Sequence, residues 1–276
     1  MFPGARTDRE AASYVVVGAP LDATTTFQPG TRFGPDRIRQ FARTYDDYDH
    51  HTKSEFSALG VHDAGDIHPW DDVSAYLEHL AAELRSITYD DAVPLLIGGE
   101  HTVTYAGVEA ADPDVLVVCD AHLDLRDTYD GTPWNHACVT RRALDDLGVD
   151  RAVIVGARTG AAAEWERAAN SDVTVVPPDD AQQWVNELEA DAFADTTVYC
   201  SVDIDGLDPA YAPGTGTMEP FGLTPRTVRD LVRTVAPHAA GFDVVEVNDR
   251  DDGQAAALAG KLLREFVRVH ARSESR

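Results

Sequence analysis

The chain has 276 residues, 43% of them hydrophobic, and is long enough to bury a large core. Its formal net charge of -25 argues against binding to nucleic acid or anionic membranes, because both require Lys and Arg to neutralise phosphate. No apolar run approaches the roughly 18 residues of a membrane span, and the first residues lack the layout of a secretory signal. We therefore expect a soluble, cytoplasmic protein.

The acidic residues are spread along the chain, with 48 Asp and Glu against 23 Lys and Arg. A dispersed acidic surface is typical of a halophilic protein, in which high salt screens the repulsion between like charges. A general attraction for cationic ligands is the second interpretation. The three cysteines form neither a zinc motif nor a disulfide framework, which favours reduced thiols.

Eight short apolar runs, rich in β-branched residues, predict strands. Several are apolar on both faces, as expected for a parallel sheet covered by helices on both sides. The predicted strands, in chain order, cover residues 13–19, 57–63, 92–99, 114–121, 151–157, 172–177, 197–203 and 241–247.

Helical patterns lie between most of these runs. They cover 34–45, 71–86, 102–110, 138–147, 161–169, 179–190, 225–235 and 254–271. The alternation of strand and helix predicts one domain over residues 1–276. Its fold class is α/β, a three-layer α/β/α arrangement with a mostly parallel sheet of roughly eight strands. In such sheets the ligand site forms at the carboxyl ends of the strands.

Acidic residues and histidines follow the predicted strand at 114–119. Here the sequence reads Asp120-Ala121-His122-Leu123-Asp124. If the strand alternation continues, the two acids and the histidine point to one side, away from Cys119. This spacing makes the segment a candidate metal-binding sequence.

Two further predicted strands end in similar residues. The strand 197–202 is followed by Asp203 and Asp205, and the strand 94–97 by Gly-Gly-Glu-His, ending at His101. Together the three segments bring four carboxylates and two imidazoles to one edge of the sheet. Clustered carboxylates repel one another unless cations lie between them.

These ligand types favour a particular kind of metal centre. Oxygen and imidazole ligands without thiolate suit a pair of Mn²⁺-like ions better than Zn²⁺ or Ca²⁺. Two such ions lower the pKa of a shared water from about 15.7 towards neutrality. The sequence therefore predicts hydrolytic chemistry with an activated water.

Longer motifs extend this hypothesis to a family. GGEHT (98–102), DAHLD (120–124) and SVDIDGLDPAYAPGTGT (201–217) closely resemble motifs of the ureohydrolase family, which includes arginase and agmatinase. QPGTRFGPDRIR (28–39) and DVVEVN (243–248) extend the resemblance over essentially the whole chain. The resemblance implies an arginase-like fold, a guanidino substrate and two Mn²⁺ ions per subunit. It also implies a homo-oligomer, a trimer or hexamer.

The resemblance also implies which residues bind the metals, with Asp120 and Asp203 bridging. One metal would be held by His101, Asp120, Asp124 and Asp203, and the second by His122, Asp120, Asp203 and Asp205.

Three residues would have roles in the reaction itself. Asp124 would also orient the attacking hydroxide, and Glu246 would bind the guanidinium through a fork-shaped contact. His136, in WNHAC, would give a proton to the leaving amine, since a histidine with a near-neutral pKa suits that task. Ala137 stands where the family commonly has Gly. A loop histidine that is merely hydrogen-bonded is the competing interpretation for His136.

The substrate is harder to predict. GTGTMEPFGLT (214–224) is similar to the agmatinase branch, which tends to read GTGTPEPGGLT, although Met218 and Phe221 depart from it. The resemblance therefore favours agmatine, a small cationic guanidino compound, cleaved to putrescine and urea in polyamine biosynthesis. Arginine, guanidinobutyrate, guanidinopropionate and formiminoglutamate stay open. So do a non-catalytic family member, a related zinc deacylase and attack by a cysteine thiol.

Overall fold

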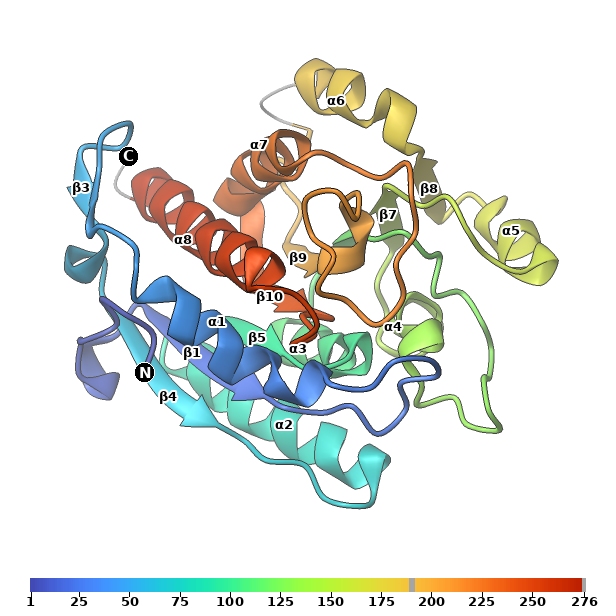
Figure 1. The fold of residues 1–276 in the computed structure, drawn as a ribbon, viewed down its shortest axis with the longest axis horizontal. Helices are drawn as coiled ribbons and strands as arrows, with labels where there is room; N and C mark the ends of the chain where they lie inside the picture. Colours follow the sequence, from blue (N-terminus) through green and yellow to red (C-terminus); the bar gives the residue numbers. More distant parts are fainter. Residues whose placement is uncertain (189–191, 275–276) are drawn as a thin grey trace.

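The computed structural model describes residues 1–188 and 192–274 and contains a parallel sheet between two layers of helices (Figure 1). The eight strands have the order β4-β1-β5-β10-β9-β6-β7-β8, and every neighbouring pair is parallel. This confirms the predicted fold class. The strands are β1 (Tyr14–Ala19), β4 (Val61–Asp66), β5 (Val93–Gly98), β6 (Val115–Cys119), β7 (Arg151–Val155), β8 (Val173–Val176), β9 (Val198–Asp203) and β10 (Ala239–Val245). A small antiparallel pair, β2 (Tyr48–Asp49) and β3 (Ser54–Glu55), stands apart from the sheet.

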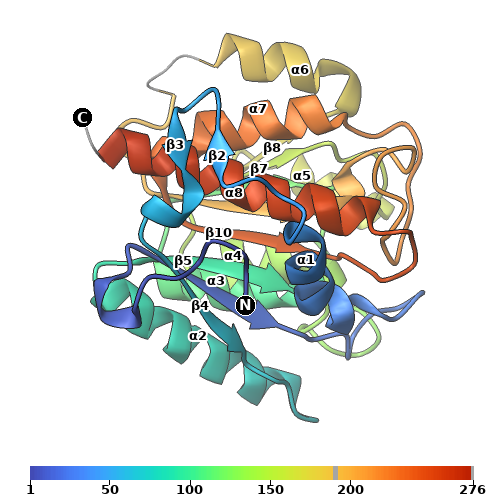
Figure 2. The same cartoon turned by 60° about the vertical axis from the view of Figure 1, so that its left-hand side comes forward.

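Helices cover both faces of the sheet (Figures 1 and 2). On one face α8 packs against α1 and α7, and α6 packs against α7, while α2, α3 and α4 pack in sequence on the other. The helix α5 lies beside the edge strand β8. The helices are α1 (Gly34–Ala42), α2 (Val73–Tyr89), α3 (Thr104–Ala111), α4 (Val139–Asp146), α5 (Ala162–Ala168), α6 (Pro178–Glu187), α7 (Pro225–Val235) and α8 (Gln254–Glu274).

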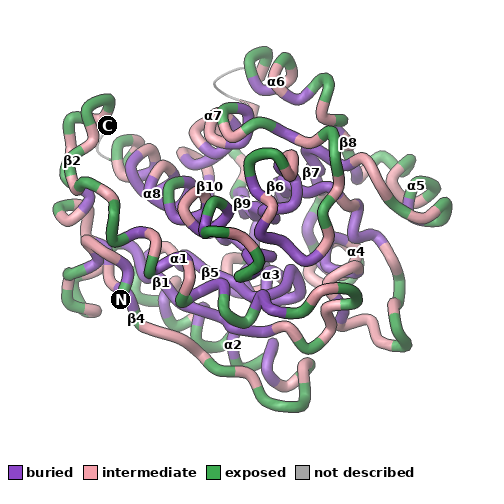
Figure 3. The backbone as a smooth tube through the Cα atoms, viewed as in Figure 1, coloured by how far each residue is buried: buried purple, intermediate pink, exposed green. Residues whose placement is uncertain are grey.

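Burial explains why the strands are apolar on both sides. Every residue of β1, β6 and β9 is buried, so neither face of these strands meets water (Figure 3). Each fully buried Val or Leu side chain contributes about 1.5–3 kcal/mol relative to its exposed state. The sheet is therefore a rigid platform for the loops at its carboxyl edge.

Side-chain caps fix where two of these helices begin. The carboxylate of Asp72 accepts a hydrogen bond from the backbone N–H of Ala75 at the start of α2. At the start of α7, the hydroxyl of Thr224 accepts from the N–H of Thr227, and Pro225 follows it. Such caps satisfy N–H groups that have no partner within the helix.

Most predicted elements differ from the observed ones by a few residues at their ends, and two of them show why. The strand predicted at 57–63 runs instead from Val61 to Asp66, because the residues before it form a short 3-10 helix, Phe56–Ala58, and a glycine turn at Gly60 with φ of 73°. The helix predicted at 179–190 ends at Glu187, and residues 189–190 of that prediction lie outside the described residues. No described helix is long and apolar enough to cross a membrane.

The strand alternation predicted for 120–124 is wrong. β6 ends at Cys119, and Asp124 has a left-handed backbone with φ of 49°. The segment is a loop, so the side chains converge through loop geometry rather than through the period of a strand.

Candidate metal centre

Four consecutive strands of the sheet deliver the predicted site residues to one edge. β5, β10, β9 and β6 are neighbours, and their carboxyl ends lead into His101, Glu246, Asp203 and Asp120. Parallel strands place these ends at the same edge of the sheet. Side chains up to 145 residues apart in the sequence therefore meet there.

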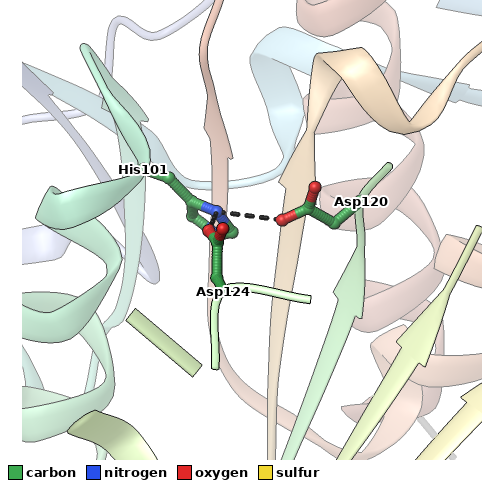
Figure 4. A group of neighbouring side chains, drawn as sticks. All are labelled: His101, Asp120 and Asp124. Carbon is green, nitrogen blue, oxygen red and sulfur yellow. Dashed lines mark hydrogen bonds and ion pairs between the residues drawn. The ribbon is translucent and has the colours of Figure 1, made fainter. Parts of the chain in front are cut away.

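The first group consists of His101, Asp120 and Asp124 (Figure 4), with Asp203 nearby. Nδ1 of His101 lies 2.8 Å from Asp124 Oδ2, 3.1 Å from Asp120 Oδ2 and 3.5 Å from Asp203 Oδ2. All four side chains are buried. A single ring nitrogen carries at most one proton, so it can satisfy only one of the three carboxylates that face it.

The second group consists of Asp120, His122 and Asp205. Nδ1 of His122 lies 3.1 Å from Asp205 Oδ2 and 3.4 Å from Asp120 Oδ1. The two oxygens of Asp120 thus face different histidines. Within the described residues, His101, Asp120 and Asp124 bring their ligand atoms close enough to hold one metal ion, and Asp120, His122 and Asp205 do the same for another.

Backbone hydrogen bonds orient the two acids on which the groups depend. Asp120 Oδ1 accepts from the N–H of His122 at 2.7 Å, and Asp205 Oδ1 accepts from the N–H of Ala121 at 3.2 Å. Asp120 Oδ2 then faces His101 and Asp205 Oδ2 faces His122, while Asp120 Oδ1 also lies 3.4 Å from His122. The loop backbone therefore sets the direction of the ligands.

The protonation of the site reflects the crowding of charge. Burial and then the charge of Asp120 raise the pKa of Asp124 to about 7. Burial, followed by Asp205 and Asp120, raises the pKa of Asp203 well above its usual range. Burial opposes the charged form of Asp120 too, but the nearby rings of His101 and His122 lower its pKa below the ordinary value.

This donor set fits divalent cations. Asp120 Oδ2 is buried without a hydrogen-bond partner among the described residues, as expected for a metal ligand. Carboxylates and imidazoles without thiolates suit Mn²⁺-type ions, and cations between the carboxylates would remove their mutual repulsion. The two His/Asp groups are thus consistent with a binuclear metal site.

Asp203 occupies a different position from the other predicted ligands. Its Oδ1 accepts a hydrogen bond from the N–H of Asp205 at 2.9 Å, where it caps a short 3-10 helix. Its Oδ2 faces His101, yet Asp203 is not a member of either close group. The bridging role of Asp203 stays a prediction.

Two residues that the sequence analysis did not single out form a chain of contacts to Nε2 of His101, the ring nitrogen that does not face the carboxylates. His101 Nε2 lies 3.3 Å from the hydroxyl of Ser201, which donates to Asp243 Oδ1 at 2.6 Å. Such contacts fix which ring nitrogen is free to bind a metal. Both residues lie within motifs quoted above, Ser201 in SVDIDG and Asp243 in DVVEVN, so their position in a motif is the signal that could have identified them.

A cavity of about 370 Å³ opens beside the two groups. His122 and Asp124 line it, and so does the predicted proton shuttle, His136. Arg126 and Glu164 form another part of the wall, where Arg126 Nε lies 3.2 Å from Glu164 Oε2. The cavity gives a small polar molecule access to the candidate metal centre.

His136 lies on the cavity wall, and its pKa is lower than the near-neutral value expected of a proton shuttle. Its Nε2 lies 3.0 Å from the hydroxyl of Thr26, and its Nδ1 lies 3.8 Å from Glu246 Oε1. Burial, together with the positive charges of His122 and His101, lowers the pKa of His136 to about 4. At neutral pH the ring is therefore uncharged and must take up a proton before it can donate one.

Glu246 is buried and has a left-handed backbone with φ of 60°. Its Oε1 accepts a hydrogen bond from the N–H of His101 at 2.9 Å. Among the described residues, no hydrogen bond to Oε2 occurs, so this oxygen is the one available to a ligand. The fork-shaped contact predicted for Glu246 would use Oε2 and the second acceptor site of Oε1.

The three departures from the family pattern have different consequences. Ala137 does not have a positive φ, so its backbone suits any residue. Met218 is half exposed, with 50% of its surface accessible. Phe221 has a left-handed backbone with φ of 67° and is 87% exposed, a conformation that suits the glycine of the agmatinase pattern better.

Comparison with known proteins identifies the family of this chain. A model described as "Arginase family" matches residues 12–268. The chain belongs to the arginase family. An agmatinase of Pyrococcus horikoshii is 37% identical over 96% of this chain and 94% of that protein. An N(1)-aminopropylagmatine ureohydrolase of Thermococcus kodakarensis is also 37% identical, over 92% and 89%.

Solved structures of the arginase family have the same fold. The crystal structure of agmatine ureohydrolase of Thermoplasma volcanium superposes with a TM-score of 0.90 and 35% identity. The superposition covers 99% of this chain and 95% of that one. The chain is thus an agmatinase-like ureohydrolase with an arginase-like sheet, as the sequence motifs predicted.

Proposed function

We propose that this ureohydrolase cleaves agmatine to urea and putrescine with the help of two Mn²⁺ ions. The observation that carries the proposal is the pair of His/Asp groups that share Asp120 beside a cavity. A carboxylate shared between two groups of ligands would hold two metal ions close together, which suits a hydrolase with two metals.

Each metal ion would be bound by a different set of residues, with Asp120 in both sets. His101, Asp120 and Asp124 would hold one ion, and His122, Asp120 and Asp205 the other, with Asp203 beside the first. When bound, such a pair supplies hydroxide at neutral pH and stabilises negative charge that develops in the transition state.

Two residues of the site would act on the substrate. Glu246 Oε2 would accept hydrogen bonds from the planar guanidinium and hold it against the metal centre, a charge-assisted contact. His136 would take up a proton from solvent and deliver it to the nitrogen of the leaving amine. Its position on the cavity wall gives the ring access to both solvent and substrate.

The choice of agmatine rests on relatives. The names of the relatives from Pyrococcus and Thermoplasma specify agmatine, while the relative from Thermococcus is named for a longer derivative of agmatine at the same 37% identity as the Pyrococcus protein. Sequence identity therefore favours the agmatine moiety but does not separate the two compounds. N(1)-aminopropylagmatine is the second candidate substrate for this reason.

The test measures urea released with added Mn²⁺ from agmatine, N(1)-aminopropylagmatine, arginine and guanidinobutyrate. The variant Asp120→Asn removes the carboxylate that both groups share and is expected to abolish urea release. The matched control is Asp114→Asn, the same change at an exposed acid that accepts a hydrogen bond from the N–H of Thr197.

Each outcome decides a different part of the proposal. Urea from agmatine with a kcat/KM well above that of the other compounds supports it. Preference for another guanidino compound overturns the substrate while leaving the reaction type. Bound Mn²⁺ without urea from any of the four compounds overturns the proposed activity.

A further inference from the structure

Glu100 is a fully buried acid with no assigned role. It lies between Gly99 and the metal-ligand candidate His101. Among the described residues, it belongs to neither His/Asp group and does not line the cavity. Among the described residues it makes no ion pair. A buried carboxylate without a cation is costly unless hydrogen bonds satisfy it.

Threonines of a distant loop supply those hydrogen bonds. Glu100 Oε1 accepts from the hydroxyl of Thr24 at 2.7 Å, and Oε2 accepts from the N–H of Thr24 at 2.9 Å and the hydroxyl of Thr25 at 3.1 Å. The backbone of Glu100 is fixed as well, because its N–H donates to Leu21 O at 2.7 Å. The carboxylate therefore holds the loop after β1 against the loop after β5.

The same threonine loop holds the segment that carries His136. The Thr24 hydroxyl accepts from the N–H of His136 at 3.2 Å, and the Thr24 carbonyl accepts from Asn135 Nδ2 at 3.3 Å. The Thr26 hydroxyl lies 3.0 Å from His136 Nε2. Both the backbone and the ring of His136 are thus fixed by the loop that Glu100 holds.

We propose that Glu100 is a positioning residue that acts through Thr24 and Thr26 to set the orientation of His136 for proton transfer. The inference rests on the proposed function, in which His136 supplies the proton. The hydroxyl of Thr24 donates to Glu100 and accepts from the N–H of His136, so its direction depends on an acceptor at Glu100 Oε1.

This dependence makes Glu100→Gln an informative change. Glutamine has nearly the same shape, but one of its two terminal atoms is a donor. The N–H of Thr24 and the hydroxyls of Thr24 and Thr25 all donate to Glu100, so a hydroxyl that faces the amide nitrogen must give up its donor role there. The direction of that threonine hydroxyl changes while the metal ligands keep their side chains.

The experiment combines kinetics with hydrogen exchange on the Mn²⁺-loaded enzyme. We expect Glu100→Gln and Thr26→Val each to lower kcat about 10- to 100-fold, within the roughly 10²–10⁴ that a positioned acid–base group contributes, with KM changed less than about twofold. Because the two changes act on one chain of contacts, the double variant loses no more than about the larger single effect. Exchange in peptides covering 22–30 and 133–138 becomes faster in Glu100→Gln.

The control is Asp49→Asn. Asp49 Oδ1 accepts from the N–H of Thr52 at 2.7 Å and from its hydroxyl at 2.8 Å, so the same acid-to-amide change is made at another acid that holds a loop, in the β2–β3 hairpin. It is expected to leave kcat and exchange in the two peptides unchanged.

Three results would overturn the inference. One is an unchanged kcat in Glu100→Gln, and another is a loss that saturating Mn²⁺ restores, which would place the effect at His101. The third is unchanged exchange at 133–138, and this readout holds even if the wild type releases no urea. An inactive wild type would refute the proposed function alone, while the exchange result would still decide whether Glu100 positions His136.

Discussion

The hydroxyl of Ser201 connects a buried carboxylate to a candidate metal ligand, and its removal makes a sharp test of the metal centre. Ser201→Ala leaves His101 Nε2, which now lies 3.3 Å from that hydroxyl, without a partner in a buried place. An unsatisfied buried donor costs about 1–3 kcal/mol. That cost corresponds to roughly 5- to 150-fold in metal affinity, in line with the roughly 10- to 100-fold typical of such supporting residues.

Calorimetric titration with Mn²⁺ measures this change directly. We expect one of two binding steps to weaken, because Ser201 contacts His101 and makes no described contact with His122. Asp243→Asn keeps an oxygen that can accept from Ser201, so its effect is expected to be smaller. The matched control is Thr140→Val, which removes a buried hydroxyl that has no hydrogen-bond partner among the described residues.

The reasoning fails if Ser201→Ala binds both Mn²⁺ ions within twofold of the wild type. It also fails if Thr140→Val weakens binding as much as Ser201→Ala does, because the effect would then be one of general packing. Equal weakening of both steps would mean that the His101 and His122 groups do not bind independently.

Three more variants test other features. Arg39→Met breaks a buried pair with Asp63, at N–O distances of 2.8 and 2.9 Å, and is expected to cost about 3–5 kcal/mol in urea unfolding at pH 7. Burial raises the pKa of Asp63, but Arg39 holds that pKa below the ordinary 3.8. The destabilisation by Arg39→Met therefore shrinks as the pH falls below 3.8, because Asp63 becomes protonated and no longer needs its partner. Phe221→Gly removes a side chain that costs about 1–2 kcal/mol in a left-handed backbone, and we expect a higher melting temperature. His136→Asn is expected to lower kcat by roughly 10²–10⁴ without loss of Mn²⁺ affinity.

The fold was predictable because its signal is local. Runs such as Val115–Cys119 are short and apolar on both faces, which favours a strand covered by helices on both sides. The boundaries were less predictable. The strand expected at 57–63 begins four residues later, after a turn whose Gly60 carbonyl accepts a hydrogen bond from the distant N–H of Ser13 at 2.8 Å.

The site was predictable as a set of residue types but not as a geometry. The sequence places acids and histidines after parallel strands, and the sheet order then brings them together. The contacts that support them are not local: Thr24 meets Glu100 across 76 residues, and Thr26 meets His136 across 110. A pKa of about 4 at His136 likewise arises from burial and neighbouring charges, which no spacing of residues reveals.

The buried acids of the candidate site and the acids on the surface should respond differently to salt. The acids of the candidate site, such as Asp120 and Asp205, are buried, whereas most of the 48 acidic residues are on the surface. Raising the ionic strength from 0.01 to 1 M shortens the screening length from about 30 to about 3 Å, which weakens surface repulsion far more than interactions between buried groups. We therefore expect KCl to raise the melting temperature strongly. We expect it to change the Mn²⁺ affinity of the folded protein less than the Mn²⁺ affinity of EDTA, a chelator that is fully exposed to solvent. A melting temperature that falls with KCl would refute the halophilic interpretation of the surface, because self-repulsion would then not limit stability.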